Sequence, residues 1–163
     1  MKTIKKILAM FVALMMAFTM NAPVFAATST GTITLHTGKL NVSGVTFNIY
    51  KIMDATVSGD NVNYTINKQF TNFFDATLLS GVDGDTTDEK AYNYLKANVS
   101  KTDFQTDLKN YITANHTSIT STTLQDTNLS ANKTLEASRL GYGYYAVIPT
   151  DASTYSPMFT TLH

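Results

Sequence analysis

Cysteine and tryptophan are absent from this 163-residue chain, and charged residues make up only 15% of it. Without cysteine the chain can form no disulfide and offers no thiol nucleophile, no Cys-based zinc site and no thioester. Its three histidines, His36, His116 and His163, lie far apart in dissimilar contexts, so we expect no metal cluster. An exported chain of this kind must be stabilised by other interactions, or come from an organism that does not rely on disulfides.

Enzyme motifs are also missing from the sequence. It contains no Gly-x-Ser-x-Gly motif, no phosphate-binding loop and no paired-carboxylate pattern. Asp83, Asp85 and Asp88 make an oxygen-rich stretch, but the spacing of an EF-hand is not met, and a solvated loop is favoured over a calcium site. Asp151 begins a segment similar to a metal-dependent adhesion site, but Tyr155 stands where a second serine is needed. We expect no enzyme activity, cofactor or metal.

The first 26 residues have the organisation of a secretory signal peptide. A positive region of Lys2, Lys5 and Lys6 precedes an apolar stretch over residues 7–20. Small residues then occupy the positions that a signal peptidase reads, so cleavage is expected after Ala26. The short apolar stretch and the cleavage site disfavour the alternative, a retained membrane anchor. We expect a secreted chain with no membrane contact after cleavage.

Removal of the signal makes the chain mildly acidic. The whole chain has a formal net charge of +0, but three of its 12 basic residues lie in the signal and all 12 acidic residues follow it. This balance disfavours nucleic acid or an anionic membrane surface as a partner. Residues 27–163 are enough for one domain with its own core.

Alternating apolar and polar residues predict three strands early in the mature chain, over residues 31–37, 45–53 and 62–66. A turn at Ser58–Asn61 makes the second and third of them a hairpin. Lys51 falls on the apolar face of the second strand, which is the most unusual placement in the sequence. The apolar residues of that face are Val45, Phe47, Ile49 and Met53.

The period changes to that of a helix over about residues 87–115. Thr86 or Thr87 can cap a first helix, and acids follow in its first turn, where the helix dipole favours them. A second amphipathic helix follows an interruption at residues 100–103 and ends near Asn115. The polar, Thr-rich residues 117–132 then predict a loop or a short edge strand.

The densest apolar and aromatic run of the mature chain covers residues 140–149. Residues 133–137 form a short strand before it, and Ser138 and Arg139 are expected to turn the chain into it. Both faces of the run are apolar, which predicts a central strand covered on both sides. One face comprises Tyr142, Tyr144, Ala146 and Ile148, and the other Gly143, Tyr145 and Val147. A last strand is expected at residues 157–162, and the whole pattern predicts a single β-sandwich with a helical insertion.

Four segments carry a family resemblance. They are Gly31–Thr34, Gly44–Asp54 with its Tyr-Lys-Ile-Met-Asp ending, Leu140–Val147 with its Gly-Tyr-Gly-Tyr-Tyr core, and Tyr155–Leu162 with its Ser-Pro-Met-Phe. In order and spacing they resemble the N-terminal domain of Gram-positive backbone pilins, the sortase-assembled, isopeptide-forming fimbrial proteins. Members of that family carry a Tyr-Lys-Ile/Leu-Phe-Asp strand, a Leu-x-x-Gly-Tyr-Tyr-aliphatic-aliphatic strand and a Ser/Ala-Pro-apolar strand.

The resemblance implies an immunoglobulin-like sandwich in a protein exported to the cell wall. It also implies polymerisation with other pilin subunits by a class C sortase, and a structural or adhesive role toward a host surface or extracellular matrix. The family's pilin-motif lysine, its later domains and its Leu-Pro-x-Thr-Gly sorting signal follow this point and do not occur here. We therefore expect residues 27–163 to be a fragment of a pilin, a domain lacking its last strand, with a divergent secreted relative as the alternative.

Some domains of that family form a Lys–Asn isopeptide bond, in which an amine attacks a carboxamide. The lysine must be neutral, which burial favours, and a nearby carboxylic acid shuttles protons. Lys51 is the best donor candidate, Lys39 the second and Glu136 a candidate acid, while the acceptor asparagine usually lies on the last strand. The alternative is that Lys51 extends from a strand edge into solvent and Glu136 is a surface residue.

A second function is compatible with the same sandwich, namely a secreted carbohydrate- or protein-binding module. The tyrosines of residues 142–145 would then form a stacking surface for sugar rings. Core packing is favoured for them, because they lie in the least polar stretch of the chain.

Overall fold

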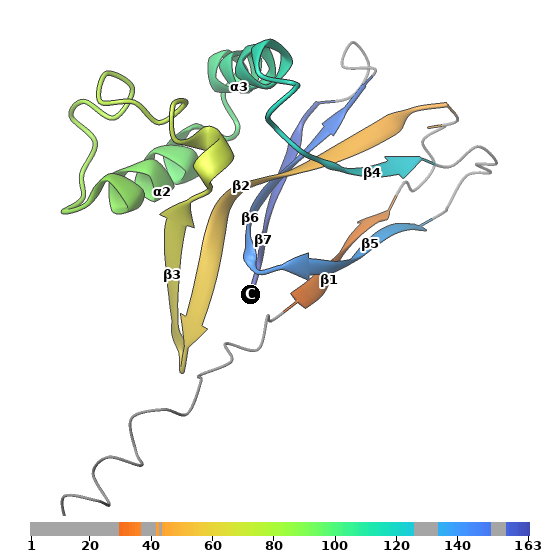
Figure 1. The fold of residues 1–163 in the computed structure, drawn as a ribbon, viewed down its shortest axis with the longest axis horizontal. Helices are drawn as coiled ribbons and strands as arrows, with labels where there is room; N and C mark the ends of the chain where they lie inside the picture. Colours follow the sequence, from red (N-terminus) through yellow and green to blue (C-terminus); the bar gives the residue numbers. More distant parts are fainter. Residues whose placement is uncertain (1–29, 37–41, 43, 126–133, 151–155) are drawn as a thin grey trace, which may run out of the picture.

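A computed structural model describes residues 30–36, 42, 44–125, 134–150 and 156–163. The expected signal peptide, Lys39 and the segment from Asp151 to Tyr155 lie outside the described residues. The described chain is mainly β, with its helices between the third and fourth strands (Figure 1). The predicted β-sandwich with a helical insertion is confirmed.

The elements alternate as the sequence predicts, β then α then β. In chain order they are β1 (Thr30–His36), β2 (Thr46–Ser58), β3 (Asn61–Ile66), the 3-10 turn η1 (Lys68–Phe70), α2 (Thr87–Asn98), α3 (Thr102–Ala114), β4 (Thr122–Gln125), β5 (Thr134–Gly141), β6 (Gly143–Pro149) and β7 (Met158–Leu162). The helices cover one face of the main sheet, and the ribbon of β1 and β5 covers the other. None of the helices in the described part of the chain is long and apolar enough to span a membrane.

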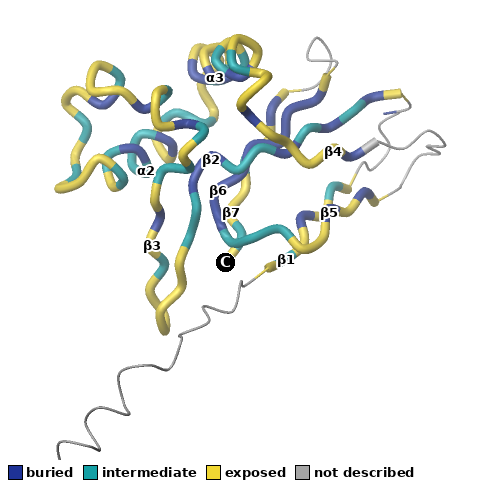
Figure 2. The backbone as a smooth tube through the Cα atoms, viewed as in Figure 1, coloured by how far each residue is buried: buried dark blue, intermediate teal, exposed yellow. Residues whose placement is uncertain are grey.

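β2 and β6 form the centre of a five-stranded sheet of order β3-β2-β6-β7, in which β4 also pairs with β2. β2 is 13 residues long, so its outer edge accommodates both β4, at Thr46–Ile49, and β3, at Met53–Ser58. All seven residues of β6 are buried (Figure 2). Tyr144 faces the helices and Tyr145 faces the ribbon, as the alternation predicts for this strand.

β5 extends further than the sequence predicts. The sequence predicts a turn at Ser138 and Arg139, but both lie within β5, which runs to Gly141 before the chain bends at Tyr142. The prediction is wrong because these residues form a β-bulge. The pairing between β1 and β5 shifts register at this point, and Arg139 has a left-handed φ of 60°.

A second bulge lies in β2, at Ile52. Lys51 pairs with Tyr145 and Met53 with Tyr144, so two steps along β2 match one step along β6. The extra residue reverses the alternation of side chains beyond it. Met53 therefore belongs to the core under the helices, whereas the apolar residues before Lys51 face the ribbon. The prediction that Met53 shares a face with Val45, Phe47 and Ile49 is wrong, because it assumes that side chains alternate regularly through residue 52, where the bulge lies.

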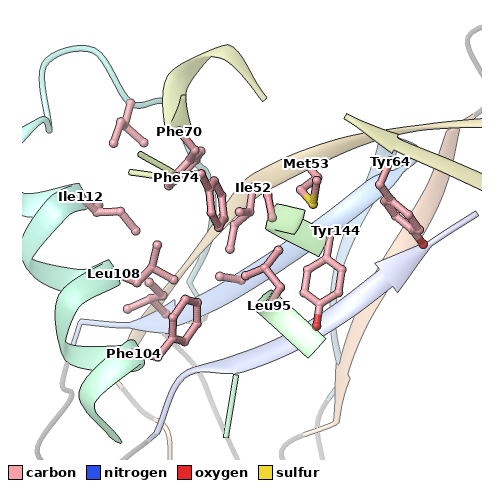
Figure 3. Close-up of a cluster of buried hydrophobic side chains, with 14 of the residues drawn as sticks. Ile52, Met53, Tyr64, Phe70, Phe74, Leu95, Phe104, Leu108, Ile112 and Tyr144 are labelled. Carbon is pink, nitrogen blue, oxygen red and sulfur yellow. The ribbon is translucent and has the colours of Figure 1, made fainter. Parts of the chain in front are cut away.

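The larger core lies between the helices and the main sheet (Figure 3). Thr86 caps α2 as predicted, because its hydroxyl accepts a hydrogen bond from the Glu89 amide at 3.2 Å. The carboxylate of Asp88 accepts a hydrogen bond from the Ile66 amide at 2.8 Å, which ties the start of α2 to the end of β3. The most deeply buried members of this core are Ile52, Met53, Phe70, Phe74, Ala91, Leu95, Leu108 and Ala146.

The smaller core lies between the main sheet and the ribbon. It takes Ile33 from β1, Leu135 and Ala137 from β5, and Tyr145 and Val147 from β6. The remaining members are Val42, Val45, Phe47, Ile49 and Leu124. The main sheet is thus apolar on both faces, which explains the unbroken apolar run of β6.

Replacing Leu95 with alanine tests the packing of α2 on the sheet. The Leu95 side chain is fully buried between the helices and the sheet. Truncation of a buried leucine costs about 2–5 kcal/mol, so we expect Leu95→Ala to lower the free energy of unfolding by that amount in a urea titration. Val57→Ala, at a side chain that is 44% exposed, should change it by less than about 0.5 kcal/mol. Equal losses in the two variants would contradict the core described above.

Candidate functional site

Lys51 lies where the outer edge of β2 passes from β4 to β3. Neither strand pairs with residues 50–52, and a polar segment fills the gap. The Asn67 amide donates to the Ile52 carbonyl at 3.0 Å, and the Asn67 side chain accepts from the Gln69 amide at 3.1 Å. The Gln69 side chain donates to the Ser118 carbonyl at 2.9 Å and to the Thr120 hydroxyl at 3.1 Å. The backbone amide of Asn67 therefore takes the place of a neighbouring strand at this point, and the two side chains hold the segment that carries it.

The Lys51 side chain passes over two glycines. A Cβ atom on Gly141 would lie 2.8 Å from Nζ of Lys51, and one on Gly143 would lie 3.1 Å from its Cγ. The absence of side chains at these two positions therefore makes the space that the lysine occupies. Nζ also lies 5.8 Å from the centre of the Tyr145 ring, within the range of a cation–π contact.

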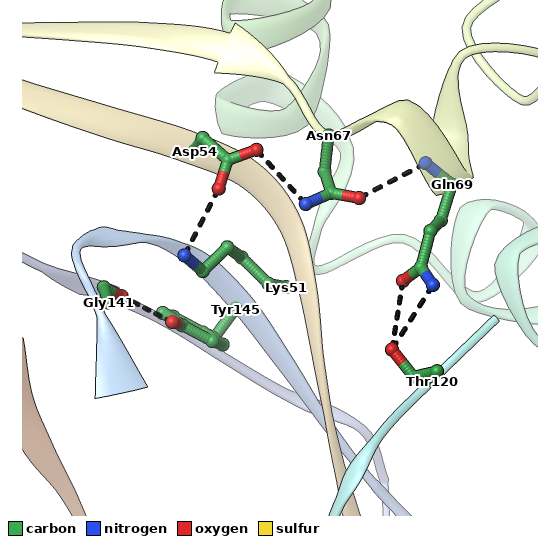
Figure 4. Close-up of polar contacts among 7 residues, drawn as sticks. All are labelled: Lys51, Asp54, Asn67, Gln69, Thr120, Gly141 and Tyr145. Carbon is green, nitrogen blue, oxygen red and sulfur yellow. Dashed lines mark hydrogen bonds and ion pairs between the residues drawn. The ribbon is translucent and has the colours of Figure 1, made fainter. Parts of the chain in front are cut away.

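Asp54 receives the ammonium group of Lys51 (Figure 4). Nζ is 3.1 Å from Oδ1 of Asp54, and Oδ2 accepts a hydrogen bond from Asn67 Nδ2 at 3.0 Å. Residues three apart in a regular strand point to opposite faces, so the bulge at Ile52 is what brings these two together. Their side chains are 27% and 46% exposed, so the pair contributes less than about 1 kcal/mol. Its main effect is to fix the position of the lysine.

Tyr145 closes the site from β6. Its hydroxyl donates a hydrogen bond to the Gly141 carbonyl, and the side chain is 2% exposed. Burial raises the pKa of Tyr145 to about 12, and the negative charge of Asp54 acts in the same direction as a smaller cause. Tyr145 is therefore a neutral donor at physiological pH, and it holds the bend between β5 and β6.

A pocket of about 260 Å³ opens beside the ion pair. Its lining is mostly polar and comprises Ile49, Lys51, Asn67, Gln69, Thr120, Ser121, Thr122 and Tyr145. The lining residues carry one ammonium, two carboxamides and several hydroxyls. Such a set can hold a carbonyl or carboxylate oxygen by hydrogen bonds.

The structure does not bring the three isopeptide candidates together. Lys51 is in the main sheet, whereas Glu136 is exposed on β5, opposite Thr34 in the separate ribbon. Lys39 lies outside the described residues. The acid that contacts Lys51 is Asp54, which the sequence analysis missed. The sequence marks Asp54 only as the last residue of the Tyr-Lys-Ile-Met-Asp segment, because regular alternation places it on the face of the strand opposite to Lys51.

The geometry at Lys51 favours an ion pair over condensation. An amine attacks a carboxamide through its lone pair, which an ammonium ion lacks. Nζ of Lys51 instead lies against the half-exposed carboxylate of Asp54, and the Asn67 carboxamide hydrogen bonds to that same carboxylate. An isopeptide bond at Lys51 stays a prediction of the family resemblance.

A second cavity, of about 650 Å³, lies between β3 and the start of α2. Tyr64 and Tyr92 stack in its wall with ring centres 4.6 Å apart, and the Tyr64 hydroxyl lies 3.2 Å from Nδ1 of His163. The remaining lining residues are Val62, Asn63, Thr86, Asp88 and Glu89. Asp83 and Asp85 do not join Asp88 in a metal cluster, and no cluster of three metal-binding side chains occurs in the described residues.

No known family model matches the chain, and no curated protein matches it. The pilin resemblance therefore rests on the four segments quoted above and on how their residues contact one another.

Gly143→Ala should destabilise the fold more than Gly141→Ala. A Cβ atom at Gly143 would overlap the Met53 carbonyl oxygen, which belongs to the backbone and cannot move away. We expect a loss of about 1–3 kcal/mol in the free energy of unfolding, measured in urea. At Gly141 the new methyl group meets only the flexible end of Lys51, so the loss should be smaller. The reverse order would contradict the described path of the lysine.

Titration of Tyr145 should depend on Asp54. The folded chain holds the phenol proton more tightly than the unfolded chain, whose tyrosine pKa is about 10. The resulting stabilisation is present below pH about 10 and is lost as the pH rises through the folded pKa of about 12. In an NMR titration, Asp54→Asn should lower the pKa of Tyr145 but leave it above 10, because burial is the larger cause.

Asp60→Asn, in the turn between β2 and β3, is the matched control. Asp60 is exposed and outside the site, so this variant should leave the Tyr145 titration unchanged. A pKa of about 10 for Tyr145 in the unmodified chain, the ordinary value for tyrosine, would contradict the buried position of its ring.

Proposed function

We propose that the chain is a structural subunit, or part of one, of a Gram-positive surface pilus, and that it contributes to adhesion. One observation carries the proposal. The Gly44–Asp54 and Leu140–Val147 segments, which carry the strongest part of the resemblance, supply most of β2 and β6, and these strands pair along the centre of the sheet.

The two motifs contact each other residue by residue. Lys51 of the Tyr-Lys-Ile-Met-Asp segment passes over Gly141 and Gly143 of the Gly-Tyr-Gly-Tyr-Tyr segment and approaches the Tyr145 ring. The two motifs therefore depend on each other, because Gly141 and Gly143 of one motif leave space for Lys51 of the other. This dependence supports the resemblance more strongly than either motif alone.

Immunoblots of cell-wall extracts test the proposal. Covalent polymers of a sortase substrate survive boiling in detergent, so an antibody against this chain should detect a ladder of high-mass bands. Deletion of the class C sortase gene of the same strain should reduce the ladder to a single band. A single secreted band in both strains would contradict a role as a pilus subunit.

The reading frame beyond His163 offers an independent check. A pilus subunit of this kind requires a lysine in a Tyr-Pro-Lys context and a Leu-Pro-x-Thr-Gly sorting signal. A longer frame that contains neither would contradict the proposal without any experiment on cells.

A secreted binding module is the second candidate, and the cavity at Tyr64 and Tyr92 favours it. The partly buried ring of Tyr92 stacks on the buried Tyr64 and lies beside Asp88, Glu89 and Asn63, and this set supplies the mixture of apolar surface and hydrogen-bonding groups that sugars require. The tyrosine run of β6 is not that surface, because Tyr144 and Tyr145 are buried in the two cores. Glycan-array binding that Tyr92→Ala abolishes would support this candidate.

A further inference from the structure

We propose that a groove between β1 and β7 binds an extended, uncharged peptide strand donated by another polypeptide chain. The donated peptide would pair with the free edge of β1 on one side and the free edge of β7 on the other, and so connect the ribbon to the main sheet. This inference does not depend on a role in a pilus, since it concerns the binding of a strand to the purified domain.

The groove has a volume of about 200 Å³ and runs between two strands that belong to different sheets. Thr32–Leu35 of β1 form one wall and Met158–Leu162 of β7 form the other. Leu124 and Val147, both buried, line it as well. The groove therefore combines an apolar lining with two strand edges.

The two edges are unpaired on the side of the groove. In the described residues, β1 pairs only with β5, and β7 pairs only with β6. β1 and β7 come together at one end, and Figure 1 shows the C-terminus beside β1. At this end a Cβ atom on Gly31 would lie 2.7 Å from Cδ1 of Leu162. Each strand thus presents unused backbone donors and acceptors along the groove.

Neither edge carries the features that protect free strands from pairing. Exposed edges usually contain a lysine, a proline or an inward-pointing charge. Residues 30–35 of β1 and Met158–Leu162 of β7 contain none of these. By contrast, β5 carries Glu136 and Arg139 at exposed positions. The two edges that face the groove are therefore unprotected by these features.

The occupant follows from this chemistry. Two facing edges require a segment with free backbone groups on both of its sides, which excludes a strand that is already part of another sheet. A folded second copy offers its own β1 or β7 with only one free side, so it can satisfy one wall at most. The apolar lining requires apolar side chains at alternate positions, and a groove without charged residues favours an uncharged segment. Five residues of β7 correspond to a paired length of roughly 17 Å.

Fluorescence anisotropy on the secreted form of the full chain tests the proposal. The probe is a capped nine-residue peptide of alternating threonine and valine with a terminal dye. We expect saturable binding of one peptide per chain. The same peptide with N-methyl groups on alternate residues should bind at least about tenfold more weakly, because one of its two edges is blocked and it can no longer pair with β1 and β7 together. Equal binding of the two peptides would overturn strand addition.

Thr160→Lys locates the binding site. Thr160 is exposed and lines the groove, so a lysine there should weaken binding at least about tenfold without affecting the cores. Thr117→Lys, at an exposed position after α3, is the matched control and should bind normally. Unchanged thermal unfolding of both variants excludes a folding defect.

Three other outcomes would overturn the proposal. The first is the absence of peptide binding, including the case in which another segment of the same chain already fills the groove. The second is a concentration-dependent dimer that excludes the peptide, since the occupant would then be a second copy. The third is peptide binding that Thr160→Lys and Thr117→Lys leave equally strong.

Discussion

The antiparallel pairing of β2 with β6 holds two separate cores in one domain. One face of this pair is covered by α2 and α3, and the other by the ribbon of β1 and β5. Side chains on both faces must then be apolar, which leaves little room for a polar group at the centre of the sheet. The only lysine of β2 is accommodated where the backbone departs from regular alternation, at the bulge of Ile52.

That bulge determines the chemistry of the Lys51 site. It directs Ile52 and Met53 into the core under the helices and lets Asp54 return to the side of Lys51. The lysine is then supported by Asp54, by two glycines and by the Tyr145 ring, and all of these except Asp54 come from the segment around the bend between β5 and β6. The site is therefore a junction between two sequence motifs, and its polar groups position one amine.

Much of the fold could be predicted from the sequence, because regular alternation is a local property. The faces of β6, the hairpin of β2 and β3, the cap at Thr86 and the helical insertion all follow from periods of two or 3.6 and from capping chemistry. The two bulges could not be predicted, since each depends on the register of a partner distant in the chain. For the same reason the site was only half found, with Lys51 identified and Asp54 and Asn67 missed.

The ribbon of β1 and β5 is attached to the domain less firmly than the strands of the main sheet are attached to one another. In the described residues its strands pair only with each other, and it is attached through the side chains of the smaller core and the bend at Tyr142. Opening of the ribbon would expose Tyr145 and Val147 but would not uncover the side chains packed under the helices. A mechanical load applied at the N-terminal end would reach the ribbon first and could release it as a flap before the central sheet yields.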